Sequence, residues 1–130
     1  MRTKTDKYGQ ILAPHHDGEL LGVMCLSNSE VEIMYRCTKG VQRVIRLLSV
    51  YEMDISCFRN GNIILSIMIH PAEEASERVS KAQLCRLGYG RPIPLKGKVL
   101  FLLDSSYGAE IIANCDDVLL ESADDKPKET

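Results

Sequence analysis

Two stretches of this chain carry an apolar residue at every second position, and this period of two constrains the fold more than any other feature. They run from Val31 to Cys37 and from Tyr51 to Cys57. Successive side chains of a strand point to opposite faces, so each stretch predicts a strand with one face against a core. A third stretch, Ile63 to Ile69, is apolar on nearly both faces, which is typical of a central strand. We therefore expect a sheet with at least one covered face.

Two other segments predict helices. Between Thr38 and Leu48 the apolar residues recur every three or four positions, and the hydroxyl of Thr38 can cap a helix N-terminus. From Pro71 to Arg86, proline and glutamates occupy the first turn and an arginine the last, and Gly88 supplies a stop. Each segment is expected to pack one apolar face on the sheet.

The remaining segments predict further strands and turns. Asn60-Gly61 lies between two strand patterns and favours a tight hairpin, since both residues tolerate positive φ. The ranges 19–27 and 98–104 are strand candidates. Residues 105–121 are ambiguous between a hairpin and a short helix, and we favour strands there with a break between Asn114 and Asp117.

The order of these elements from Val31 to Asp104 is that of the ferredoxin-like βαββαβ arrangement. We therefore predict an α+β fold with two helices on one face of an antiparallel sheet, and extra strands at the N- and C-terminal sides. The chain has 130 residues, which suits one domain. We assign that domain to 19–121, between a flexible arm (1–18) and a disordered tail (122–130).

Composition argues against several functional classes. A net charge of -2 provides no basic field for nucleic acid, and the chain has no Trp and only 2 Phe for stacking on bases. The 5 cysteines never form a CxxC pair, which argues against a disulfide framework or a zinc knuckle. No apolar run reaches the roughly 18 residues of a membrane span, and no secretory signal is evident. We expect a cytoplasmic protein with no membrane contact and no cofactor.

VEIMYRCTKGVQRVIRLLSVYEMDISCFR resembles the opening of an ACT domain, a small regulatory module of amino-acid metabolism. The following GNIILSIMIHPAEEASERVSKAQLCRLGYG is similar to the family's third strand and second helix, so the resemblance covers about residues 31–90. Gly40 matches the loop glycine of the family, and Met53-Asp54-Ile55 falls at its strand motif. The resemblance implies an effector-binding or subunit-pairing module, in which side-by-side sheets form dimers and small ligands bind between the glycine loop and a neighbouring chain.

The candidate ligand-binding residues are therefore Thr38, Lys39, Gly40 and Asp54. Glycine lacks a Cβ, so a ligand carboxylate can approach backbone N–H groups at the start of the predicted helix. Asp54 can receive an amino group. The alternatives are a plain turn at Gly40 and a solvated carboxylate at Asp54. His15, His16 and Asp17 could offer metal ligands, but adjacent histidines on a strand point apart and a convincing third ligand is missing. We therefore predict no metal site.

These features predict a non-enzymatic regulatory or interaction module that pairs with itself or a larger subunit and binds an effector such as an amino acid. The alternative is an inhibitor or immunity-type protein that blocks a partner protein. An enzyme would require His70, Asp104 and Tyr107 to meet in one pocket, so we predict no catalytic residues.

Overall fold

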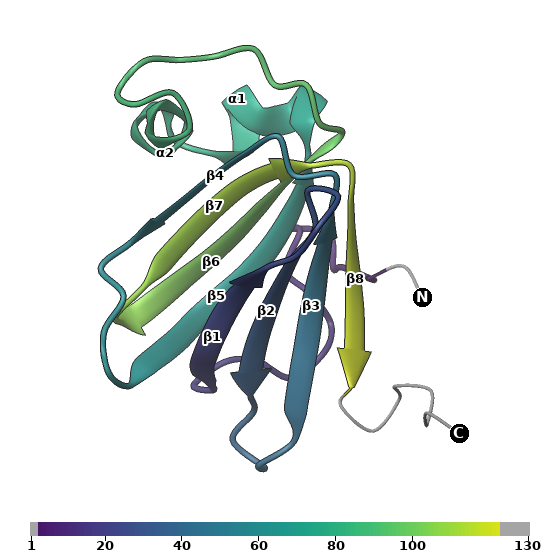
Figure 1. Cartoon of the computed structure of the whole chain (residues 1–130), viewed down its shortest axis with the longest axis vertical. Helices are drawn as coiled ribbons and strands as arrows, with labels where there is room; N and C mark the ends of the chain where they lie inside the picture. The colour runs from purple at the N-terminus through teal and green to yellow at the C-terminus, as the bar shows by residue number, and fades with distance from the viewer. Residues whose placement is uncertain (1–2, 123–130) are drawn as a thin grey trace.

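A computed structural model describes residues 3–122, which form a β-rich fold with two short α-helices (Figure 1). The strands are β1 (Glu19–Cys25), β2 (Val31–Arg36), β3 (Gln42–Leu48), β4 (Glu52–Ser56), β5 (Asn62–Pro71), β6 (Val99–Tyr107), β7 (Glu110–Cys115) and β8 (Asp117–Ser122). The helices α1 (Ala75–Arg78) and α2 (Lys81–Arg86) follow a 3₁₀ turn at Ala72–Glu74, between β5 and β6.

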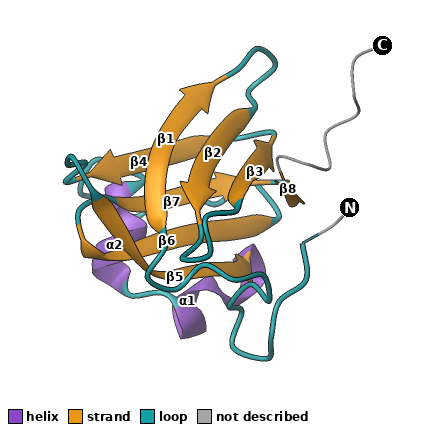
Figure 2. Ribbon diagram, turned by 90° about the horizontal axis from the view of Figure 1, so that it is seen from below, coloured by secondary structure: helices purple, strands orange, loops and turns teal. Residues whose placement is uncertain are grey.

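All strand pairs are antiparallel, in the order β4-β7-β6-β5-β1-β2-β3-β8. We call β4, β7, β6 and β5 the helix-covered half, and β1, β2, β3 and β8 the open half. The two halves are joined by two residue pairs between β1 and β5. On the other side the two halves are linked by two chain connections, one from β3 to β4 and one from β7 to β8. The sheet therefore folds over and encloses an interior (Figure 2).

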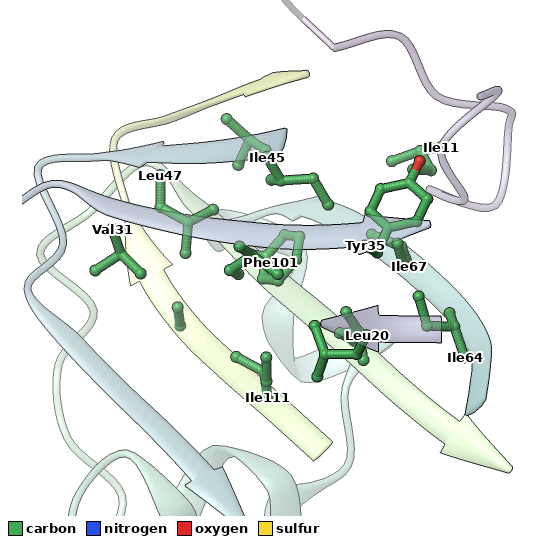
Figure 3. Close-up of a cluster of buried hydrophobic side chains, with 14 of the residues drawn as sticks. Ile11, Leu20, Val31, Tyr35, Ile45, Leu47, Ile64, Ile67, Phe101 and Ile111 are labelled. Carbon is green, nitrogen blue, oxygen red and sulfur yellow. The ribbon is translucent and has the colours of Figure 1, made fainter. Parts of the chain in front are cut away.

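The interior is an aliphatic core to which both halves contribute. From the open half come Val31, Ile33, Tyr35, Ile45 and Leu47, and from the helix-covered half Ile64, Ile67, Phe101, Leu103 and Ile111, all buried (Figure 3). Burial of one such side chain stabilises a fold by roughly 1.5–3 kcal/mol. The alternating pattern predicted in β2 is confirmed, because residues 31, 33 and 35 are buried and those between them are less so.

The helix predicted from Thr38 to Leu48 is wrong. The chain instead turns back after Cys37, whose N–H donates to the carbonyl of Val41 at 2.9 Å, and continues as β3. Gly40 adopts a φ of 87°, which suits a hairpin turn. The three- and four-residue spacing of apolar residues was misleading because β3 buries two consecutive residues on opposite faces, Ile45 in the interior and Val44 on the outer face. Consecutive β-branched residues also favour a strand.

The second predicted helix is present but broken. Val79 is extended, with a ψ of 137°, and separates α1 from α2. Ser80 then caps α2 in a reciprocal arrangement with Gln83. These helical turns lie on the outer face of the helix-covered half, where Ala75, Val79 and Leu87 pack on Leu100, Leu102 and Ile112.

The ferredoxin-like, α+β fold class is therefore wrong. Helical structure occurs in residues 3–122 in one excursion between β5 and β6, not as two helices between strands. The hairpin predicted at Asn60-Gly61 is also wrong, since β4 pairs with β7 while β5 pairs with β1 and β6. Gly61 does have a positive φ, 85°, but the turn connects strands that are not neighbours. A local turn signal does not specify which strands pair.

Other expectations about strands are confirmed. β5 lies inside the sheet, between β6 and β1. The ambiguous C-terminal segment forms β7 and β8, with the break at Asp116. No helix within residues 3–122 combines the length and apolar character needed to cross a bilayer.

The segment expected to be a flexible arm lies against the sheet. Ile11 is buried and its N–H donates to the carbonyl of Ile67 at 3.0 Å, while the hydroxyl of Tyr35 donates to Pro14 at 3.1 Å. How far this segment moves stays a prediction. Beyond Ser122, the predicted disordered tail lies outside the described residues.

Candidate functional site

The predicted ligand-binding residues occupy separate parts of the molecule. Thr38, Lys39 and Gly40 form the turn between β2 and β3, and Asp54 lies on β4. This turn is at the opposite end of β3 from the segment that leads into β4 (Figure 1). A Cβ added to Gly40 would meet no atom within 4 Å, so the turn points into open space. The structure does not bring Gly40 and Asp54 together.

Asp54 belongs to an ion network centred on Arg86. The Arg86 guanidinium donates to the Asp54 carboxylate at 2.8 Å, to the Ser56 hydroxyl at 2.9 Å and to the Glu110 carboxylate at 3.2 Å. These bonds fasten α2 to β4 and β7. Burial raises the pKa of nearby Asp104, Glu110 raises it further, and Arg86 partly opposes both effects. The Asp54 carboxylate is thus already engaged by a cation of the same chain.

The residues that an enzyme would need are spread along the sheet. His70 pairs with Leu100 near the start of β6, whereas Asp104 pairs with Ser66, and Tyr107 ends β6. Four residues of strand separate positions 100 and 104, which is about 13 Å. Burial lowers the pKa of His70, Arg78 lowers it further, and Glu74 opposes them. These side chains do not form a catalytic group.

The histidines near the N-terminus interact with backbone carbonyls. Nδ1 of His15 lies 2.7 Å from the carbonyl oxygen of Ala13, and Nδ1 of His16 lies 2.9 Å from that of Leu65. Across residues 3–122, no group of three or more His, Cys, Asp and Glu side chains is placed to hold a metal ion.

The junction of the two halves contains a groove of about 450 Å³, which we call the seam groove. It opens where β1 diverges from β5, because their pairing stops after two residue pairs and β1 is irregular between Leu20 and Gly22. The buried residues Leu20 and Asn62 contribute to its lining. The other lining residues are Glu19, Leu21, Phe58, Arg59, Asn60 and Gly61.

One side of the seam groove is held by the side chain of Asn62. Its Oδ1 accepts the N–H of Arg59 at 2.9 Å and that of Ala109 at 2.8 Å, and its Nδ2 donates to the Arg59 carbonyl at 2.6 Å. A Cβ on Gly108 would lie closer than 3.0 Å to the Asn62 side chain, so this packing requires glycine. The side chain of Asn62 therefore links the β4–β5 loop to the turn between β6 and β7.

The loop held by Asn62 and the neighbouring end of β6 present aromatic and cationic groups to solvent. Phe58 is 53% exposed and Tyr107 is 52% exposed. The Arg59 guanidinium lies 5.6 Å from the centroid of the Tyr107 ring, within the range of a cation–π contact. Aromatic residues and arginine are the side chains most enriched at protein–protein contacts.

Sequence reasoning missed this group. Phe58 and Arg59 were not among the candidate residues, and Tyr107 appeared only among the residues that an enzyme would require. The available signal was a phenylalanine beside an arginine and an Asn-Gly turn in a chain with only 2 Phe. Tyr107 could not be added, because only the fold places it beside Arg59.

Comparison of the chain with family models, with curated proteins and with solved structures finds no match. Inferences about function therefore depend on the geometry of the seam groove and on the charges around it.

Proposed function

We propose that this protein is a non-enzymatic protein-binding module whose partner contacts Phe58, Arg59 and Tyr107 beside the seam groove. The observation that carries the proposal is the exposed aromatic and arginine group held by the buried Asn62 side chain. Such a module can regulate or inhibit the protein that it binds.

A rigid loop favours tight binding, because its conformational entropy is already lost before the partner arrives. Two hydrogen bonds between Asn62 and Arg59 hold the loop in place, and a third joins Asn62 to Ala109 in the turn between β6 and β7. Phe58 offers apolar area, the Arg59 guanidinium can bind a partner carboxylate, and Glu19 offers a charge for a partner cation. The groove of about 450 Å³ has room for an anchoring side chain.

The other candidate functions have less support. The effector proposal needs Gly40 and Asp54 in one site, and they lie apart. An enzymatic function needs a catalytic group that His70, Asp104 and Tyr107 do not form. A homodimer is a special case of protein binding, in which the partner is a second copy of the chain.

The proposal can be tested with a photocrosslinking amino acid at position 60, two residues after Phe58, in extracts of the source organism. The matched control carries the same probe at position 24 on β1, where Met24 is 50% exposed. We expect one stoichiometric crosslinked protein from position 60 and not from position 24. Purification of that protein then permits direct measurement of its affinity.

Phe58→Ala is expected to weaken this affinity by about tenfold to thirtyfold, because truncation of a contact aromatic typically costs about 1.4–2 kcal/mol. Isothermal titration calorimetry measures the change. Equal crosslinking from both positions, or an unchanged affinity of Phe58→Ala, would contradict the proposal.

A further inference from the structure

Strand β4 has a free edge. It is the last strand of the helix-covered half, and β7 is its neighbour in the sheet. Asn114 on β7 turns its carbonyl towards β4, where it accepts the N–H of Tyr51 at 2.9 Å, and Asn114 stands opposite Glu52. Backbone direction alternates along an antiparallel strand. The N–H and C=O groups of Met53 and Ile55 therefore face away from β7.

An edge of this kind is a template for pairing with another chain, and proteins usually protect it with charges or covering segments. Asp54 is the central residue of β4, but its carboxylate is bound by Arg86 and directed towards α2. Ile55 is 36% exposed. Within residues 3–122 no hydrogen bond covers the outer edge of β4.

The edge at the other end of the sheet is different. On β8, the carbonyl of Val118 accepts the N–H of Thr3 at 3.3 Å and the hydroxyl of Thr3 at 2.9 Å. Part of the β8 edge is thus covered by the chain itself, whereas no hydrogen bond from the described residues covers the β4 edge.

We propose that β4 pairs with an extended segment of the partner protein in which basic and apolar residues alternate. The inference rests on the proposed function and names the kind of partner. On β4, Glu52 and Asp54 point to the helix side of the sheet and Met53 and Ile55 to the interior side, as the pairing with β7 requires. Facing side chains of paired strands lie about 4.5–5.5 Å apart. Because Arg86 already binds the Asp54 carboxylate, the charge that β4 offers to a partner is that of Glu52, so a complementary strand presents Lys or Arg beside Glu52 and aliphatic residues on the other side.

Charge disfavours a second copy of this chain at the same edge. Two-fold pairing of β4 with itself would place Glu52 and Asp54 of one copy beside those of the other, with Glu110 of each copy one strand further away on β7. Two cations offset part of this negative charge: Arg86, and Lys96, which lines a pocket together with Glu52. The half-buried Asp104 adds to the negative charge. Like charges across paired strands are destabilising. A basic segment would instead place opposite charges across the paired strands, which is stabilising.

The segment would also continue into the seam groove. β4 ends at Ser56, and Phe58 follows two residues later. A partner strand on β4 can therefore place its next residues beside the aromatic and arginine group. Backbone pairing then supplies affinity and the groove supplies specificity, as in other complexes formed by strand addition.

A first experiment uses a synthetic peptide that alternates Lys and Val over the length of β4. Controls are a Glu–Val peptide of the same pattern and a peptide with the same Lys and Val residues in two blocks. We expect saturable binding by the alternating Lys–Val peptide alone, with slowed hydrogen exchange at the amides of Met53 and Ile55. Equal binding of the block peptide, or no slowing at these amides, would overturn the inference.

A second experiment removes one edge donor. Ile55→Pro deletes an N–H that faces away from β7, so the ladder between β4 and β7 keeps its bonds. We expect the peptide to bind at least about tenfold more weakly, which corresponds to about 1.4 kcal/mol. Leu120→Pro is the control, because the backbone of Leu120 likewise faces away from its neighbouring strand, on the outer edge of β8. It should leave peptide binding unchanged.

Glu52→Lys provides a test that leaves the backbone intact, in case Ile55→Pro fails to fold. It should abolish the preference for the Lys–Val peptide over the Glu–Val peptide. An unchanged preference in a folded Glu52→Lys protein would contradict the inference.

The partner crosslinked through position 60 separates the two proposals. If Phe58→Ala weakens its binding while Ile55→Pro and Glu52→Lys do not, strand addition at β4 is wrong and the proposed function stands. If Ile55→Pro and Glu52→Lys weaken binding while Phe58→Ala does not, the contact at Phe58 is wrong and strand addition stands.

Discussion

The two halves of the sheet share one interior but differ on their outer faces. The outer face of the helix-covered half has its own apolar cluster, formed with α1 and α2, and the Arg86 network. On the open half, Met24 is exposed and a 2.9 Å ion pair joins Arg46 to Glu32. The comparison teaches that the interior stabilises both halves, whereas the helical excursion stabilises one half and places Arg86 against the carboxylates of β4 and β7.

The largest effect is expected from Phe101→Ala. Phe101 is fully buried in the interior shared by both halves, so truncation leaves a cavity and should reduce the free energy of unfolding by about 3–5 kcal/mol. Chemical denaturation measures the loss, and hydrogen exchange should quicken in both β2 and β7. Faster exchange in only one half would break the comparison, because it would mean that the halves unfold separately.

Leu87→Ala tests the helical layer alone. Leu87 is buried where α2 ends, and its loss should cost about 2 kcal/mol, at the low end for a core leucine because a surface layer can collapse onto the gap. Hydrogen exchange should quicken most in α1 and α2 and least in β2. Equal quickening in β2 would show that the layer supports the open half as well.

Arg86→Met separates the ion network from the apolar cluster. It leaves the Asp54 and Glu110 carboxylates without their guanidinium, but both are partly exposed, so the expected loss is about 1–2 kcal/mol. Thermal denaturation provides the measurement. Arg78→Met, which removes an exposed pair with Glu74, is the matched control and should cost less than about 0.5 kcal/mol. Similar losses for the two variants would contradict a special role for Arg86.

His70 should make stability depend on pH. Its pKa in the folded protein is lowered below the ordinary 6.5, chiefly by burial and then by Arg78, with Glu74 opposing. The unfolded chain therefore binds more protons at mildly acidic pH. The contribution of neutral His70 is complete above pH 6.5 and is lost as the pH falls from there towards the folded pKa.

Melting temperatures of the wild type and His70→Gln between about pH 5 and 8 test this dependence. The wild-type curve should fall more steeply on the acidic side. His16→Gln, at an exposed position, is the control and should keep the wild-type slope. Parallel curves for wild type and His70→Gln would contradict the prediction.

Met24→Ser should have the smallest effect, within about 0.5 kcal/mol, because the side chain is half exposed on the open half. Denaturation at several protein concentrations measures it. A larger loss that grows with concentration would show that the outer face of the open half is covered by another copy in solution.

The sequence predicted the positions of β2, β4, β5 and β6 from apolar alternation and apolar runs, but the buried face expected from Tyr51 to Cys57 is wrong, because Tyr51, Ile55 and Cys57 are exposed at the edge of the sheet. It predicted a helix at β3 because Val44 and Ile45 are buried on opposite faces, and that pattern imitates helical spacing. It selected Gly40 and Asp54 from a linear motif, whereas the structure leaves Gly40 in open space and binds Asp54 to Arg86. Tyr107 and Arg59 could not be joined from sequence, because 48 residue positions separate them and only strand pairing brings them together.

The sequence by itself thus determined where most of the strands lie, which side chains β2 buries, and where the last two strands separate. The tertiary structure alone decided that β4 pairs with β7 and β5 with β6. That pairing creates the seam groove, the group around Asn62 and the free edge of β4. The physical reason is that a period of two specifies the buried face of a strand but carries no information about the neighbour to which its backbone hydrogen bonds go.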